Sequence, residues 1–141
     1  MKTINGRMST FGGPLDTGVS PSEGLAYVEP NDLHDPWFSD LFLEHQPPGT
    51  TGLARRLDPS KYYIAMRVDN ANSGGREKVR RHYYTVIANG ARVDEVKLVD
   101  WGPNNRTGRV VDMSPGLAAK LKVLTDSFVD VKIPDDIFIN A

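Results

Sequence analysis

Apolar and polar positions alternate along several short runs of the chain, which is the pattern of β-strands that bury one face. Residues 61–68 and 82–88 are rich in aromatic and β-branched side chains, and residues 91–100 and 128–133 alternate between apolar and polar positions. These four runs are predicted strands.

A two-residue turn joins the second and third predicted strands. Asn89 and Gly90 form the strongest short hairpin signal, because a type I′ turn needs a positive φ at both positions. The alternation of the returning strand slips between Val93 and Val96. A β-bulge at residues 94–95 restores the phase.

One main helix is predicted. Ser114 is a residue type that caps free helical amide groups, and Pro115 suits the first helical position. Leucine and alanine then recur at helical spacing, which predicts a helix over residues 115–124. A second, short surface helix or lid is predicted over residues 37–46, where four apolar side chains have helical spacing.

The rest of the chain is predicted to be irregular. Residues 10–26 are rich in glycine, proline and serine, which indicates a loop. Residues 134–141 form a tail whose apolar side chains, Ile137, Phe138 and Ile139, need a surface to pack against.

Length and composition bound the function classes. The 141 residues are enough for one domain with its own core, and the absence of cysteine excludes disulfides, thiolate nucleophiles and cysteine-bound zinc. With 17 basic and 18 acidic residues the chain lacks the strong positive charge of a general nucleic-acid binder, so no nucleic acid is expected. No run approaches the length of a membrane span.

The charges are unevenly distributed. Residues 8–54 contain seven acids and no lysine or arginine, whereas residues 55–133 contain 15 bases and nine acids. Two interpretations are open. The acidic segment lies on the basic body of its own chain, or it docks a partner.

Two motifs carry a resemblance to a known family. Residues 100–103 read Asp-Trp-Gly-Pro and residues 109–114 read Arg-Val-Val-Asp-Met-Ser, followed by a predicted helix with paired alanines. This stretch resembles the double-psi β-barrel domain of the rare lipoprotein A family and, more distantly, of expansins. The convincing part covers about residues 82–133.

The resemblance implies an all-β fold, a six-stranded double-psi β-barrel with one main short helix and an irregular N-terminal arm. On this basis we expect one domain overall, with an acidic arm over residues 1–54, the barrel over residues 55–133 and the tail over residues 134–141.

Several members of the family are lytic transglycosylases of peptidoglycan, and Asp100 matches their catalytic aspartate. The position suits a general acid, because a carboxyl at the lip of an apolar barrel should have a raised pKa. Trp101 is a candidate to stack on a sugar ring, with Arg106 and Arg109 as groove-lining candidates. The alternative for Asp100 is a turn-forming role that accepts local N–H groups. Asp112 is interpreted as structural, either paired with Arg109 or bracing the loop.

Two departures from the family pattern argue against catalytic activity. Arg55 stands where the family usually places a histidine, which makes it a further candidate for substrate binding. Trp101 follows the aspartate where the family commonly has an arginine. The structural assignments are Asp112, Ser114, Asn89 and Gly90.

Other chemistry has little support in the sequence. His34, His45 and His82 lack metal-ligand spacing, so no metal or other cofactor is expected. No secretory signal is visible at the N-terminus. The expected site of synthesis is therefore the cytoplasm, with a virion or delivery to the cell wall as the destination.

Two functions remain as hypotheses. The first is a non-catalytic or weakly catalytic barrel within a larger assembly, a phage virion or a similar delivery apparatus, with other protein subunits as partners. The second is an enzyme that cleaves peptidoglycan glycan strands, with Asp100 as its acid/base group. Phage proteins and secretion-system effectors reach the cell wall without a signal peptide, so the missing signal is compatible with both hypotheses.

Overall fold

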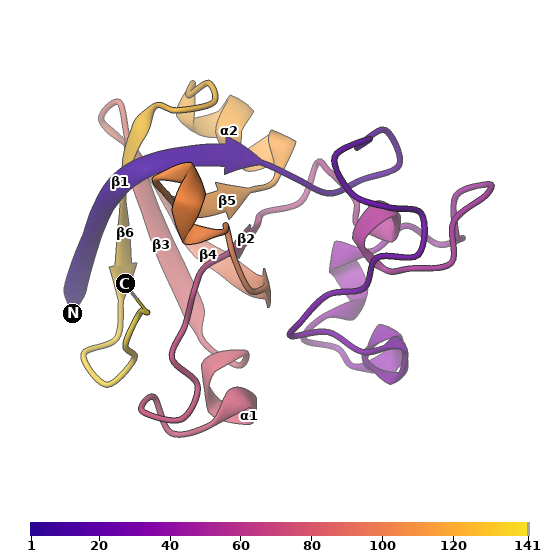
Figure 1. The fold of residues 1–141 in the computed structure, drawn as a ribbon, viewed down its shortest axis with the longest axis horizontal. Helices are drawn as coiled ribbons and strands as arrows, with labels where there is room; N and C mark the ends of the chain where they lie inside the picture. Colours follow the sequence, from indigo (N-terminus) through magenta and orange to yellow (C-terminus); the bar gives the residue numbers. More distant parts are fainter. Residues whose placement is uncertain (141) are drawn as a thin grey trace.

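The computed structural model describes residues 1–140 and shows a closed barrel of six strands (Figure 1). The strand order around the barrel is β1-β5-β2-β4-β3-β6. The strands are β1 (Lys2–Thr10), β2 (Tyr63–Ala65), β3 (Tyr83–Ala88), β4 (Ala91–Asp100), β5 (Arg109–Met113) and β6 (Phe128–Ile133). The predicted all-β class is therefore confirmed.

Two of the six strand pairs are parallel. β1 pairs in parallel with β5 and β2 pairs in parallel with β4, whereas the other four pairs are antiparallel. Parallel neighbours need long connections, so the strands of each parallel pair are far apart in the sequence although they lie side by side in the barrel. The closure leaves the barrel without a free edge.

The barrel begins earlier in the chain than the sequence indicates. Residues 2–10 lie in the range expected to be an irregular arm, yet they form β1, which pairs with both β5 and β6. The expected boundary at residue 55 is thus corrected. Only Gly6 and Met8 of this strand are buried, so its sequence lacks the apolar alternation that identifies a strand.

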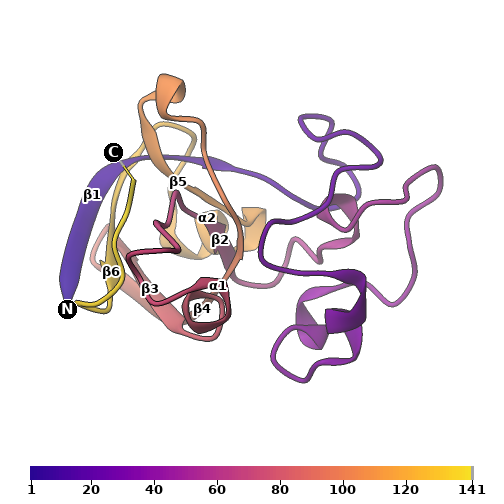
Figure 2. The same cartoon turned by 60° about the horizontal axis from the view of Figure 1, so that its bottom comes forward.

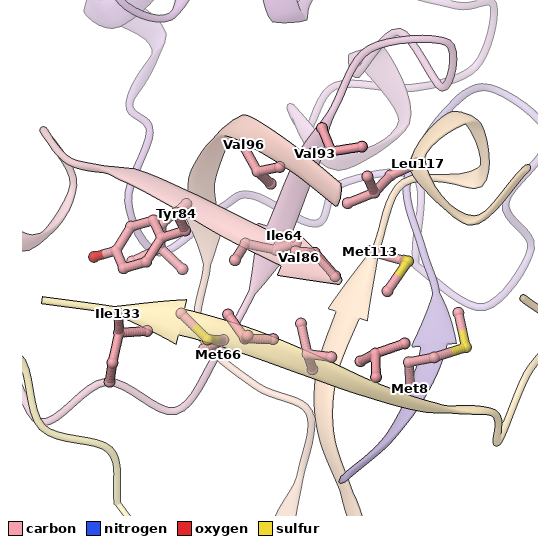
Figure 3. Packing of buried hydrophobic residues seen from close by; sticks show 14 of the residues in the cluster. Met8, Ile64, Met66, Tyr84, Val86, Val93, Val96, Met113, Leu117 and Ile133 are labelled. Atoms are coloured by element: carbon pink, nitrogen blue, oxygen red, sulfur yellow. The ribbon is translucent and has the colours of Figure 1, made fainter. Parts of the chain in front are cut away.

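The barrel interior is filled by one apolar cluster that draws on all six strands (Figure 3). Its members in the figure include Met8 of β1, Ile64 of β2 and Met113 of β5, all fully buried. Leu117 closes one end from the helix α2 (Pro115–Leu121).

The predicted hairpin is present between β3 and β4. Asn89 and Gly90 occupy the turn with φ values of 53° and 73°. The Asn89 amide donates hydrogen bonds to the carbonyls of Leu121 and Lys122, so the turn also caps the C-terminal end of α2. The β3–β4 register shifts between Tyr84 and Val86, where β4 contains one extra residue at the predicted bulge.

The helices are shorter than predicted. Ser114 accepts a hydrogen bond from the Leu117 N–H and caps α2, which ends where Lys122 adopts a left-handed conformation. The helix predicted over residues 37–46 is only a 3-10 turn, η2 (Ser39–Leu41). The other short elements are α1 (Arg76–Val79) and the 3-10 turns η1 (Pro30–His34), η3 (Ala54–Arg56) and η4 (Asn105–Thr107).

Residues 11–62 form a lobe of loops and 3-10 turns beside the barrel, here called the N-terminal lobe (Figure 2). Its own apolar cluster is built around Phe38, Leu41 and Leu57, and the barrel contributes Tyr63 and Val99 to it. Val99 is the residue added by a second bulge, where Leu98 pairs with Ile64 but Asp100 pairs with Ala65.

Acidic side chains of the lobe pair with bases of the barrel. The closest pairs join Asp32 to Arg80 at 2.7 Å and Asp35 to Arg81 at 2.6 Å. Further pairs join Asp40 to Lys97 and Glu29 to Arg76. Residues 29–40 therefore lie on the basic body of their own chain.

The C-terminal tail also packs on the barrel. Ile137 is fully buried in the barrel cluster, and Ile139 forms a β-bridge with Val68. Phe138 stays half-exposed beneath the Lys2 ammonium group, which lies 3.8 Å from the ring centroid. The N-terminal ammonium group of Met1 lies beside this tail, at 3.0 Å from Asp135.

Candidate functional site

A pocket of about 520 Å³ lies where the ends of β1, β4 and β5 meet the N-terminal lobe. We call it the acidic pocket, because four carboxylates and no basic side chain line it. Its lining residues are Ser9, Thr10, Phe11, Asp16, Gly18, Val19, Glu23, Ala65, Asp100, Trp101, Gly102, Pro103, Asn104 and Asp112.

Asp100 ends β4 and lines this pocket. Its Oδ1 accepts hydrogen bonds from the backbone N–H groups of Trp101, at 2.9 Å, and Ala26, at 2.8 Å. Burial raises the pKa of Asp100 and outweighs these two hydrogen bonds, and the negative charge of Glu23 acts in the same direction as burial. The carboxyl therefore has both the local bond of a turn-forming aspartate and the raised pKa of a general acid.

Asp112 lines the same pocket from β5. Its Oδ1 is buried and accepts no hydrogen bond within residues 1–140. Burial raises its pKa to about 6 and is helped by the charge of Asp100. The Ser9 hydroxyl and the positive charges of Arg109 and Arg67 oppose the rise. A buried carboxylate oxygen without a hydrogen bond is costly to the fold, so Asp112 is a candidate functional group.

The strand register brings the two aspartates together. β2 lies between β4 and β5, and Ala65 of β2 is opposite Asp100 on one side and Asp112 on the other. Their Cα atoms are therefore two strand spacings apart, roughly 9–10 Å. The methyl side chain of Ala65 leaves the space between the carboxyls open.

Trp101 forms one wall of the pocket and is 44% exposed. Its indole N–H donates to the Val68 carbonyl at 3.0 Å, which fixes the orientation of the ring. A ring that is held in place and half-exposed beside a carboxyl pair suits stacking on a flat apolar face of a ligand.

The three arginine candidates lie outside the acidic pocket. Arg109 pairs with Asp126 at 2.9 Å rather than with Asp112. Arg55 donates two hydrogen bonds to the Val19 carbonyl and thereby holds a loop of the lobe, and the exposed Arg106 lies on η4. The structure thus brings Asp100, Trp101 and Asp112 together and leaves the arginines at a distance from the pocket.

Sequence reasoning missed the contribution of the N-terminal lobe. Asp16 accepts hydrogen bonds from the N–H groups of Gly12 and Gly18 and so shapes the loop that forms one wall. Glu23 and the N–H of Ala26 act directly on Asp100. The only signal for this in the sequence is the run of acids before residue 54, which does not say which acids face a pocket.

The described part of the chain shows neither a cluster of metal-ligand side chains nor a membrane-spanning helix. Within residues 1–140 no group of three or more histidine, cysteine or acidic side chains is placed to hold a metal ion. No helix in the same range is long and apolar enough to cross a membrane.

Comparison with known proteins leaves the family open. No family model matches the chain, and no curated protein matches it in sequence.

Proposed function

We propose that the protein is a double-psi barrel that binds glycan strands in the acidic pocket and cleaves them with Asp100 as the acid/base group. The observation that carries the proposal is the Asp100 carboxyl, whose pKa burial raises beside the half-exposed ring of Trp101. The six-stranded closure with two parallel strand pairs supports the barrel type.

The hydrogen bonds of Asp100 suit a proton donor. Oδ1 is engaged by two backbone N–H groups, which leaves Oδ2 to hold the proton. In the proposed step Asp100 gives this proton to the glycosidic oxygen as the bond from that oxygen to C1 breaks. The carboxylate then takes the proton of the sugar's own C6 hydroxyl, whose oxygen bonds to C1 and leaves a 1,6-anhydro end.

Asp112 is proposed to tune this carboxyl. Two carboxyls on either side of Ala65 disfavour each other's ionisation, so a charge on Asp112 keeps Asp100 protonated to a higher pH. Asp112 is also a candidate base for an attacking water, which would leave a reducing end instead of an anhydro end. The product therefore distinguishes the two reactions.

The test uses purified peptidoglycan sacculi and peptide-stripped glycan strands with mass spectrometry of the products. Wild type is expected to release anhydro-ended fragments, and Asp100→Asn is expected to lose at least about a hundredfold in rate, the usual scale for a general acid/base group. Asp126→Asn is the matched control, because Asp126 is an exposed aspartate that pairs with Arg109 outside the pocket.

Three outcomes decide the proposal. Anhydro ends from wild type and Asp126→Asn, but not from Asp100→Asn, support it. Reducing ends instead of anhydro ends would mean that the protein cleaves glycan by hydrolysis and not by transglycosylation. If no fragments form and the protein does not sediment with sacculi, the proposal is wrong.

A second candidate function is a component of a larger assembly such as a phage virion. The N-terminal lobe and the tail are used within the chain itself, so neither supports this candidate. The observation that favours it is an exposed apolar pair: Leu124, in the turn after α2, is 81% exposed, and Phe128, the first residue of β6, is 66% exposed. If these side chains contact another subunit, Phe128→Ser lowers the native mass of the particle without changing the stability of the isolated chain.

A further inference from the structure

The segment directly after β2 holds the motif that carries Asp100 and Trp101. The Met66 N–H donates to the Asp100 carbonyl at 3.3 Å, and the Gly102 N–H donates back to the Met66 carbonyl at 3.5 Å. Two residues later the Val68 carbonyl accepts the indole N–H of Trp101 at 3.0 Å. This segment therefore fixes both the end of β4 and the orientation of the ring.

Arg67, in the middle of this segment, joins the two stretches of chain that carry Asp100 and Asp112. It is 9% exposed, and its Nη1 donates to the carbonyls of Pro103 at 2.7 Å and Arg109 at 2.8 Å. Pro103 comes three residues after Asp100, and Arg109 comes three residues before Asp112. One nitrogen atom therefore spans the loop between the two strands and fixes the end of β4 relative to β5.

The positive charge of Arg67 is not needed for these two hydrogen bonds, because both acceptors are neutral carbonyl groups. Burying a charge is costly unless an opposite charge compensates it. The other buried arginine, Arg80, is compensated by direct contacts with Asp32 at 2.7 Å and Glu77 at 2.8 Å. For Arg67 the compensating group is the carboxyl of Asp112, whose ionised form its guanidinium favours.

The Asp112 carboxyl faces groups from four parts of the barrel. Burial raises its pKa, and the charge of Asp100 on β4 adds to this rise. Ser9 of β1, Arg109 of β5 and Arg67 after β2 oppose it, so the pKa stays at about 6. Of the two arginines only Arg67 is buried, so its charge is the less screened by salt. Loss of this charge should therefore raise the pKa of Asp112 further.

We propose that Arg67 is the positioning residue of the carboxyl pair: it holds Asp100 and Asp112 in their relative positions and balances the charge of Asp112. This inference rests on the proposed function and adds how the proton of the pair is controlled. Because interacting carboxyls titrate together, a positive charge beside Asp112 sets the pH at which the pair gives up its shared proton. Arg67 acts through the two aspartates and does not touch the glycan.

The first test follows side-chain NMR signals of the wild-type protein as the pH is raised. The carboxyl ¹³C signal of Asp112 should titrate with a midpoint of about 6. The Nε–H signal of Arg67, a buried group without a hydrogen-bond partner, should shift with the same midpoint. Asp112→Asn should abolish this shift, whereas Asp126→Asn, outside the pocket, should leave it intact. An Arg67 signal that does not follow the Asp112 titration would overturn the inference.

The second test separates the charge of Arg67 from its packing. Arg67→Gln should raise the Asp112 midpoint by at least about half a pH unit, because a nearby opposite charge is lost. Arg67→Lys keeps the charge and should leave the midpoint near its wild-type value. Arg92→Gln makes the same charge change at the exposed, opposite end of β4 and should not move it. An unchanged midpoint in Arg67→Gln contradicts the inference, and the wild-type NMR test decides where this variant fails to fold.

Cleavage of peptide-stripped strands distinguishes this inference from the proposed function. The alkaline limb of the rate profile should move to higher pH in Arg67→Gln and return in Arg67→Lys, whereas loss of a purely structural contact would lower the rate equally at every pH. A lower rate without movement of the limb therefore counts against the inference. If wild type cleaves no glycan but the NMR signals behave as expected, the proposed function is wrong and the charge balance between Arg67 and Asp112 is confirmed.

Discussion

The barrel and the N-terminal lobe bury their side chains in different ways. The barrel cluster takes apolar residues from all six strands, so each strand is fixed by two neighbours and by the core between them. The lobe has a smaller cluster without regular strands and is held to the barrel by ion pairs along residues 29–40. The acidic pocket lies between these two regions, so its carboxyls depend on both.

Because the forces differ, the two regions should respond differently to the same kinds of change. Truncation of a buried apolar side chain should lower the stability of the whole barrel. Loss of a buried charge should release the lobe and leave the barrel folded. The lobe also supplies the Ala26 N–H that binds Asp100, so its release should alter the site without removing the aspartate.

The largest expected effect comes from Arg80→Met. This change leaves Asp32 without its partner, and breaking a buried pair costs roughly 3–5 kcal/mol. Hydrogen exchange over residues 27–38 should speed up by at least about a hundredfold, while β3 and β4 stay protected. Arg92→Met is the control, because Arg92 forms an exposed pair with Asp94. Uniform loss of protection over the barrel would contradict the separation of the two regions.

Leu117→Ala tests the barrel in the same way. Leu117 is fully buried and closes the core from α2, so the truncation should lower the free energy of unfolding by about 2–5 kcal/mol in urea. Leu124 is 81% exposed, so Leu124→Ala should change the free energy of unfolding by less than about 0.5 kcal/mol. Equal effects of the two changes would mean that α2 does not close the barrel.

Asp112→Asn should stabilise the protein at neutral pH. The pKa of Asp112 rises from 3.8 to about 6 on folding, so the folded state holds this proton more tightly than the unfolded state. Stability is therefore lost as the pH rises from about 4 through 6, by on the order of 2–3 kcal/mol. In urea unfolding, the variant and wild type should have the same free energy of unfolding at pH 4. Above pH 7 the variant should be more stable by the full amount.

Asp32→Asn should have the opposite pH dependence. Burial raises the pKa of Asp32, but the Arg80 guanidinium and the Glu29 N–H outweigh it, so the net shift is downward. Its contribution is present above the ordinary aspartate pKa and is lost as the pH falls. Hydrogen exchange over the N-terminal lobe should therefore be faster in Asp32→Asn than in wild type at pH 7, and this difference should shrink as the pH falls below 3.8. A common pH dependence for the two aspartates would contradict the assigned environments.

The sequence predicted the elements whose signals are local. The turn at Asn89 and Gly90, the bulge at residues 94–95 and the cap at Ser114 each depend on a few neighbouring residues. β1 was missed because its only buried side chain is Met8, and it is a strand through pairing with β5 and β6. Such pairing joins positions about a hundred residues apart, which no local pattern records.

The site was predictable only in part for the same reason. Asp100 and Trp101 stand in one motif, so the sequence places them together. Asp112 joins them through Ala65, which is opposite both aspartates only once the strand order is known. Arg106 and Arg109 are close to Asp100 along the chain, and Arg55 was a candidate only through the family resemblance. The barrel turns Arg109 toward Asp126 instead.

The smallest expected effect, from Arg106→Gln, separates proximity in the chain from membership of the site. Arg106 lies six residues after Asp100, but its side chain is exposed on η4 and does not line the acidic pocket. We expect the stability to change by less than about 0.5 kcal/mol and glycan binding to stay the same. Fluorescence titration of Trp101 with peptide-stripped strands measures the binding. A clear loss of binding would mean that charge on this loop is part of the site, and would remove the distinction between the acidic pocket and the surface around it.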